Sequence, residues 1–256
     1  MNKNNTLTLP DQVFSNYKDF NQSMWLKVKN RIQDFLNDGI WQVGEALPNE
    51  AELAKYFGIS MGTLRRAIGE LVQEGVLVRK QGRGTFVAEH SKEHFMYHFF
   101  RLALRGKEKK YPLVNNYYFQ SRKANQQESD ALDISLNSPV FAIQNLLFIE
   151  ETPVTVDNII ISKELFPGMN KEIFLGRDST IYNLYQNRFG IFIANANDRL
   201  SAVRCDNREI AAHLELELGT PVLKIVRVSY TYQSKPVELR TSWVNSNAAE
   251  YYSNIF

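Results

Sequence analysis

The chain of 256 residues is poor in several features, and each shortage excludes a class of protein. A single cysteine, Cys205, rules out internal disulfides and cysteine-based zinc sites, and it suits a reducing compartment. No apolar run approaches the roughly 18 residues that cross a bilayer. The polar start, residues 1–5, has no apolar core like that of a signal peptide. We therefore expect a cytoplasmic protein that does not bind a membrane.

A large excess of charge of one sign is also missing. The 30 Lys and Arg residues nearly balance 28 Asp and Glu residues, which gives a formal net charge of +2. That balance excludes a highly basic nucleic-acid coat protein but leaves room for a local basic patch, because charge acts where it is clustered. The sequence also lacks a nucleophile elbow, a phosphate-binding glycine loop and a zinc-protease motif. We expect neither an enzyme nor a bound cofactor.

Hydrophobic residues make up 44% of the chain, which is enough material for the cores of two ordinary domains. The first residues are polar and without period, and two segments of different pattern follow. We predict a flexible arm, a first domain, a linker and a second domain. Their expected bounds are 1–20, 21–88, 89–95 and 96–256.

The first domain opens with a helical pattern. Apolar residues recur at three- and four-residue steps from Trp25 until Gly39 stops them. Asn49 can cap a second, short helix, and Glu52 is placed to bond back to it as a capping box. Gly58 then ends this helix, since a left-handed residue there has no Cβ clash.

A three-residue turn, 58–60, joins the second predicted helix to a third that Ser60 can cap. This spacing is typical of a helix-turn-helix, whose second helix lies in the DNA major groove. The third helix turns an apolar stripe from Leu64 to Val72 inward. Its outward face carries Met61, Gly62, Arg65, Arg66 and Gly69. Small glycines permit close approach to a duplex, and arginine can bond guanine or phosphate in a bidentate way.

Two strand-like stretches, 76–78 and 85–87, follow as a hairpin with a basic, glycine-containing tip. Residues 63–83 hold five basic side chains against two acids, Glu70 and Glu74. The basic residues are Arg65, Arg66, Arg79, Lys80 and Arg83. The alternative is a solvated helical hairpin in a domain that has no role with DNA.

Four stretches resemble the winged helix-turn-helix of GntR-family bacterial regulators. They are 47–54 (LPNEAELA), 58–60 (GIS), 74–77 (EGVL) and 82–87 (GRGTFV). In that family the start of the third helix reads the operator and the wing enters the minor groove. The resemblance places Ser60, Thr63 and Arg65 on the reading helix, and Arg83 and Gly84 at the wing tip.

The predicted DNA-binding residues are Ser60, Met61, Gly62, Thr63, Arg65, Arg66, Arg83 and Gly84. Ala51 and Met61 stand where the family commonly has arginine. This departure bears on the operator sequence and not on the docking mode.

The second domain contains an internal repeat. A helical segment, an apolar strand from Pro139, a turn and a second strand follow one another, and the same order recurs from Pro221, 82 residues later. Each copy is a helix followed by a β-hairpin, so we predict an α+β domain with a mainly antiparallel sheet. One more helix is expected between the copies, over 179–189. A cleft between two related halves is the default ligand site.

This domain resembles the UTRA effector-binding module of the HutC subfamily over about residues 92–252. The stretches are 139–140 (PV), 152–154 (TPV), 165–168 (LFPG), 180–182 (TIY) and 235–238 (KPVE). The resemblance implies a chorismate-lyase-like fold that binds a small metabolite. We predict a ligand-responsive transcriptional regulator, a repressor that binds a palindromic DNA operator as a homodimer. The alternative is a chorismate-lyase-like enzyme with a vestigial DNA-binding head.

In that module two strand arginines typically hold the anionic group of the ligand, and here Asn145 and Leu147 stand in their places. Arg227, which the repeat offset places opposite Asn145, and Arg240 can substitute; otherwise they are surface residues paired with acids. Glu238 matches the family's pocket acid. The predicted effector-binding residues are Phe100, Asn145, Leu147, Asp157, Thr180, Tyr182, Arg227, Glu238 and Arg240. We expect an effector with at most one negative charge.

Three histidines, His90, His94 and His98, are four residues apart, a spacing that aligns metal ligands on a helix. The segment that follows, 99–102, has a strand-like pattern, which breaks that alignment. We therefore predict no metal site.

Overall fold

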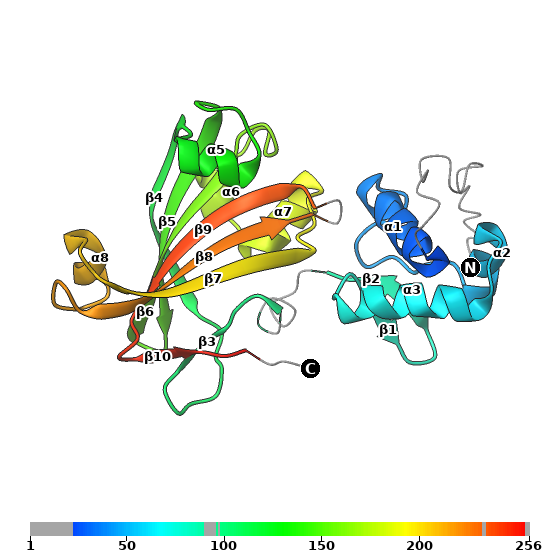
Figure 1. Ribbon diagram of the computed structural model, residues 1–256, viewed down its shortest axis with the longest axis horizontal. Helices are drawn as coiled ribbons and strands as arrows, with labels where there is room; N and C mark the ends of the chain where they lie inside the picture. The colour runs from blue at the N-terminus through cyan, green and yellow to red at the C-terminus, as the bar shows by residue number, and fades with distance from the viewer. Residues whose placement is uncertain (1–22, 90–95, 97, 232–233, 254–256) are drawn as a thin grey trace. The chain divides into compact units, whose positions relative to one another are not determined.

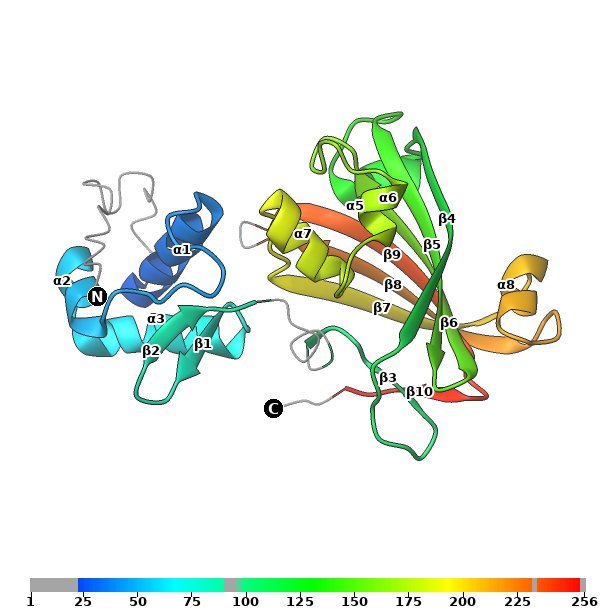
Figure 2. The ribbon, with the colours of Figure 1, turned by 180° about the vertical axis from the view of Figure 1, so that it is seen from behind.

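The computed structural model describes residues 23–89, 96, 98–231 and 234–253. The chain divides into two compact units, Met1–Glu89 and His90–Phe256, which are drawn in Figures 1 and 2. The predicted arm and nearly all of the predicted linker lie outside the described residues. Among the described helices, none has the length and apolar character to cross a membrane.

Three helices and a hairpin form the described part of the first unit. They are α1 (Met24–Asn37), α2 (Glu50–Phe57), α3 (Met61–Gln73), β1 (Leu77–Lys80) and β2 (Gly84–Val87). Asn49 Oδ1 caps α2 by accepting from the Glu52 N–H at 2.9 Å, and Gly58 ends that helix in a left-handed conformation (φ +64°). Ser60 Oγ caps α3 by accepting from the Thr63 N–H at 3.3 Å. The helix-turn-helix predicted from these caps is confirmed.

The core of the first unit fixes the angle between its helices. Phe35 of α1, Leu53 of α2 and Leu64 of α3 are each fully buried, and the rings of Phe35 and Trp41 meet edge to face with centroids 5.3 Å apart. Ala46 forms a bridge with Phe86 of β2, which ties the loop before α2 to the hairpin. The result is a winged helix, with β1 and β2 as the wing.

A six-stranded antiparallel sheet organises the second unit, in the order β4-β5-β6-β9-β8-β7. Its strands are β4 (Leu113–Lys123), β5 (Pro139–Ile149), β6 (Thr152–Ser162), β7 (Asn195–Arg204), β8 (Pro221–Tyr230) and β9 (Pro236–Val244). A separate two-stranded sheet pairs β3 (Leu102–Leu104) with β10 (Ala249–Tyr251). The predicted strand character of 99–102 is therefore correct only from Leu102 onward.

The internal repeat accounts for the sheet order. Strand β4, α5 (Gln126–Leu132), β5 and β6 make one half, and β7, α8 (Arg208–His213), β8 and β9 make the other. The halves meet where β6 pairs with β9, with Ile159 opposite Arg240. The chain crosses from β6 to β7 through α6 (Lys171–Leu175) and α7 (Ile181–Phe189).

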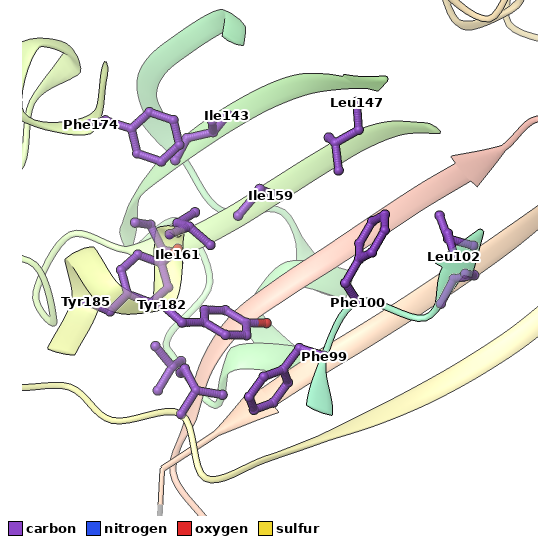
Figure 3. Close-up of a cluster of buried hydrophobic side chains, with 14 of the residues drawn as sticks. Phe99, Phe100, Leu102, Ile143, Leu147, Ile159, Ile161, Phe174, Tyr182 and Tyr185 are labelled. Atoms are coloured by element: carbon purple, nitrogen blue, oxygen red, sulfur yellow. The ribbon is translucent and has the colours of Figure 1, made fainter. Parts of the chain in front are cut away.

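Both faces of the sheet are covered, as Figures 1 and 2 show from opposite sides. Ile159 and Ile161 pack with α6 and α7, whereas Ile160 between them packs with α5. This alternation along one strand explains why the sequence there is continuously apolar. Figure 3 shows the α7 side of the core, where Tyr182 and Tyr185 lie over the sheet and the Phe99 ring meets the Tyr182 ring edge to face.

Candidate DNA-binding surface and effector site

The start of α3 is an open surface. Ser60, Gly62, Arg65 and Arg66 are exposed. Thr63 is half-buried, and its Oγ1 lies 2.9 Å from Ser60 Oγ. Met61 is half-buried as well. The opposite side of the helix, which includes Leu64, Ile68 and Leu71, is buried. The predicted reading residues therefore share one accessible face.

The basic side chains of α3 and the wing keep most of their donors free. Arg65 Nε donates to Glu50 Oε2 at 2.7 Å, yet the Arg65 side chain remains 63% exposed. Arg66 stacks on the Trp25 ring at 4.5 Å, and Lys80 lies at the same distance over Phe86. In the described part of the chain, Arg66, Arg79, Lys80 and Arg83 have no carboxylate within 4.0 Å. A cluster of cations without nearby carboxylates is typical of a protein surface that binds a phosphate backbone.

Glycine shapes the wing tip. Gly82 has φ +68° and Gly84 has φ +106°, conformations that L side chains rarely adopt. Arg83 between them is exposed, and its N–H donates to the Lys80 carbonyl at 2.9 Å to close the turn. The two glycines have no side chains, so the basic tip presents little bulk to a narrow groove.

The second unit contains a cavity of about 260 Å³ between the β4–β5–β6 half of the sheet and the start of α7. Five of the nine predicted effector residues line it: Asn145, Leu147, Asp157, Thr180 and Arg240. A smaller cavity of about 40 Å³ shares Leu147, Asp157 and Arg240 as walls. Phe100 and Arg227 line this smaller cavity. Asn145 is held by Asn116, whose Nδ2 donates to Asn145 Oδ1 at 3.0 Å.

The other two predicted residues, Tyr182 and Glu238, line neither cavity. Glu238 is fully buried beneath the wall, where it accepts from Tyr182 at 3.2 Å, from Tyr185 at 2.8 Å and from Arg240 Nε at 2.9 Å. Burial and the charge of Glu238 raise the pKa of Tyr182 to about 12, so its hydroxyl stays a donor at neutral pH. The structure thus places Glu238 one layer behind the wall, where it holds Arg240.

Arg240 joins the two halves of the sheet. Its Nη1 donates to Asp157 Oδ2 at 3.1 Å, and Ser242 Oγ donates to Asp157 Oδ1 at 2.5 Å. Burial alone would lower the pKa of Arg240, but Glu238, Tyr182 and Asp157 raise it well above its ordinary value. Arg240 therefore stays charged inside the domain, fixed by two carboxylates.

Arg227 is similarly buried but makes different contacts. Its Nε and Nη2 each lie 2.7 Å from an oxygen of Asp198, and its Nη1 donates to the Phe99 carbonyl at 2.8 Å. Tyr251 donates to Asp198 at 2.8 Å. The expectation that Arg227 and Arg240 can be acid-paired surface residues is half right, because both are paired but both are also buried.

Sequence reasoning missed the loop between α6 and α7. Leu175, Arg177, Asp178, Ser179 and Ile181 all line the larger cavity. The missed signal is local, since Arg177 lies two residues before a Ser-Thr pair that can cap a helix. Residues 111–114, ahead of and within β4, form a further wall, and they carry no sequence signal of that role.

No metal cluster is present among the residues that the structure describes. His98 is among them, whereas His90 and His94 lie outside them. Burial and the charge of Arg101 lower the pKa of His98.

Comparison with known proteins accounts for both units. The family described as "Bacterial regulatory proteins, gntR family" matches residues 26–87, and the UTRA domain matches residues 112–250. A protein of Shigella flexneri described as "Probable fructoselysine utilization operon transcriptional repressor" is 29% identical over 231 residues, which are 88% of this chain and 92% of that protein. The HTH-type transcriptional regulator GmuR of Bacillus subtilis is 25% identical over 216 residues, 82% of this chain and 89% of GmuR.

Solved structures show the same fold. The ligand-binding domain of a GntR-family transcriptional regulator from Bordetella bronchiseptica has a TM-score of 0.59 and 26% identity, and the match covers 62% of this chain and 99% of that one. PhnF from Mycobacterium smegmatis has a TM-score of 0.52 and 21% identity, over 90% of this chain and 99% of PhnF.

Proposed function

The chain belongs to the gntR family of bacterial regulatory proteins with a UTRA domain, and we propose that it is a homodimeric repressor released from a palindromic operator by a small metabolite. Its relatives are DNA-binding regulators, so it is a ligand-responsive transcriptional regulator and not an enzyme. The chorismate-lyase-like alternative is set aside on this ground. A protein that binds the bacterial chromosome acts in the cytoplasm.

The observation that carries the proposal is the free basic face of α3 and the wing. Exposed Arg65, Arg66 and Arg83 leave donors open for phosphates and base edges. A single winged helix reads only one half-site, and dimers mirror their own two-fold symmetry in two half-sites. This supports a homodimer on a palindrome.

A path for the signal supports the ligand response. Leu147, Asp157 and Arg240 line both cavities. Arg240 of β9 is opposite Arg227 of β8, which lines the smaller cavity and donates to the Phe99 carbonyl. Phe99 follows the predicted linker closely in sequence. A ligand that moves Arg240 therefore also shifts Arg227 and its hydrogen bond to the Phe99 carbonyl. A coupling free energy of about 1–3 kcal/mol weakens operator affinity roughly 5- to 150-fold.

The test uses the full-length protein in two arms. Selection from random duplex DNA yields its preferred site, and light scattering of the complex gives the stoichiometry. We expect two protomers per duplex and a site of two inverted half-sites. A metabolite library is then screened by thermal shift, and each hit is added to a gel shift. A monomer on an asymmetric site contradicts the dimer, and hits that never change DNA affinity contradict the ligand response.

A further inference from the structure

Charge is unevenly distributed around the larger cavity. On its sheet side Asp157 lines the cavity and Glu238 lies behind the wall, and both contact one guanidinium, that of Arg240. Asp157 is 2% exposed, Glu238 is fully buried and Arg240 is 8% exposed. Two carboxylates that share one cation leave the sheet side of the cavity with an excess of negative charge.

The hydrogen bonds that these two carboxylates accept come from neutral hydroxyls and from Arg240. Asp157 accepts from Ser242 and Arg240, and Glu238 accepts from Tyr182, Tyr185 and Arg240. These donors satisfy oxygens but add no further positive charge. An incompletely compensated buried charge is costly, so the sheet side of the cavity favours a cation.

Arg177, which lines the same cavity, is a cation without a paired carboxylate in the described part of the chain. Its Nη1 donates to the Phe174 carbonyl at 2.5 Å and its guanidinium stacks on the Phe174 ring at 4.3 Å, which fixes its position. Among the described residues it has no carboxylate within 4.0 Å. Burial, followed by the charge of nearby Arg240, lowers the pKa of Arg177 although two tyrosines oppose this.

The start of α7 adds to this cationic end. Ser179 and Thr180 line the cavity beside Arg177, and the nine-residue helix begins at Ile181. Helix N-termini favour anions because their first N–H groups are unpaired and the helix dipole is positive there. Arg177 and the helix start thus present the same sign of charge to one ligand group, and Asp178, which also lines the cavity here, is exposed.

We propose that the effector is a zwitterion, with an ammonium group bound at Asp157 and an acid group bound by Arg177 and the start of α7. This deepens the proposed function, on which it rests. It also revises the expectation drawn from Asn145 and Leu147. The cation that strand β5 lacks is supplied by the α6–α7 loop, so the acid group is a carboxylate or a phosphate.

The test measures binding of matched probes to the full-length protein by calorimetry. γ-Aminobutyrate is compared with butyrate and butylamine, which each keep one of its two charges. Phosphoethanolamine is compared with ethanolamine, so that this arm separates a phosphate from a carboxylate. We expect a zwitterion to bind at least about tenfold more tightly than either singly charged analogue, since one hydrogen bond to a charged group contributes that much.

Two variants assign the ends of the ligand. In Arg177→Gln, γ-aminobutyrate should bind no more tightly than butylamine, because the partner of its acid group is lost. In Asp157→Asn, γ-aminobutyrate should bind no more tightly than butyrate, because the partner of its ammonium group is lost. A role in folding alone does not move these two preferences separately. Arg188→Gln, an exposed arginine of α7, is the matched control and should change neither.

Equal binding of a zwitterion and its analogues, or no binding of any zwitterion, overturns the proposal. So does loss of both preferences in either variant. Failure of the proposed function is a separate outcome, because it appears as a protein that binds no duplex DNA. A regulator that binds its operator and responds only to uncharged metabolites refutes the zwitterion alone.

Discussion

Two sets of arginines, one from each unit, have opposite environments. Arg65, Arg66 and Arg83 are exposed, and among them only Arg65 has a carboxylate within 4.0 Å in the described part of the chain. Arg227 and Arg240 are more than nine-tenths buried, and each binds at least one carboxylate. An arginine that binds a nucleic acid must keep its N–H donors available to the phosphates. An arginine buried inside a domain must instead be paired with a carboxylate there. The three exposed arginines are therefore open to an outside ligand, whereas the two buried arginines join strands inside their domain.

The largest effect should come from breaking a buried pair. Arg240→Met leaves Asp157 and Glu238 without their shared cation, so we expect the free energy of unfolding of the second unit to fall by about 3–5 kcal/mol. Urea denaturation followed by tyrosine and tryptophan fluorescence measures it. Arg199→Met, an exposed arginine of β7, is the control and should change stability by less than about 0.5 kcal/mol. Equal stability of the two variants would show that the buried ion pairs of Arg240 stabilise the fold no more than an exposed arginine does.

On the recognition side, Arg65→Ala should leave stability unchanged and weaken operator binding by about 1–3 kcal/mol. The reason is that its guanidinium is exposed and available to DNA. Gel shifts with the selected operator measure the affinity, and Arg188→Ala, on the second unit, is the control. Undiminished affinity of Arg65→Ala would show that α3 is not the reading helix.

A smaller effect is expected at the wing. Arg83→Ala should weaken binding to all sequences nearly equally and reduce the slope of log affinity against log salt by about one, because a phosphate contact carries no base information. Titrations at several salt concentrations give the slope. A changed base preference with an unchanged slope would instead assign Arg83 to base reading.

The smallest effect is a pH dependence within the buried set. Burial alone would raise the pKa of Asp198, but the hydrogen bonds from Arg227 and Tyr251 hold it below its ordinary value. A lowered carboxylate pKa stabilises the fold above the unfolded value of about 3.9, and this stability is lost as pH falls through the folded pKa. The difference in unfolding free energy between the natural chain and Asp198→Asn should therefore narrow as pH falls. A difference in unfolding free energy that stays constant from neutral to acidic pH would contradict this prediction. Asp206→Asn, at an exposed aspartate, is the control.

The first unit was almost fully predictable because its signals are local. The caps at Asn49 and Ser60, the left-handed Gly58 and the three- and four-residue periodicity all act within a few residues of where they appear. The repeat in the second unit predicted its two helix–hairpin halves for the same reason. The pairing of β6 with β9 joins residues about 80 positions apart, and no local pattern specifies it.

The sequence by itself determined the helix-turn-helix, the basic wing, the antiparallel hairpins and five of the residues that line the larger cavity. Only the tertiary structure decided that Asp157 meets Arg240, that Glu238 lies behind the cavity wall and that Arg177 reaches the cavity. The physical reason is that the charge balance of a cavity depends on which distant side chains are buried together. Burial of that kind follows from sheet order and loop path, and neither is encoded in a short stretch of sequence.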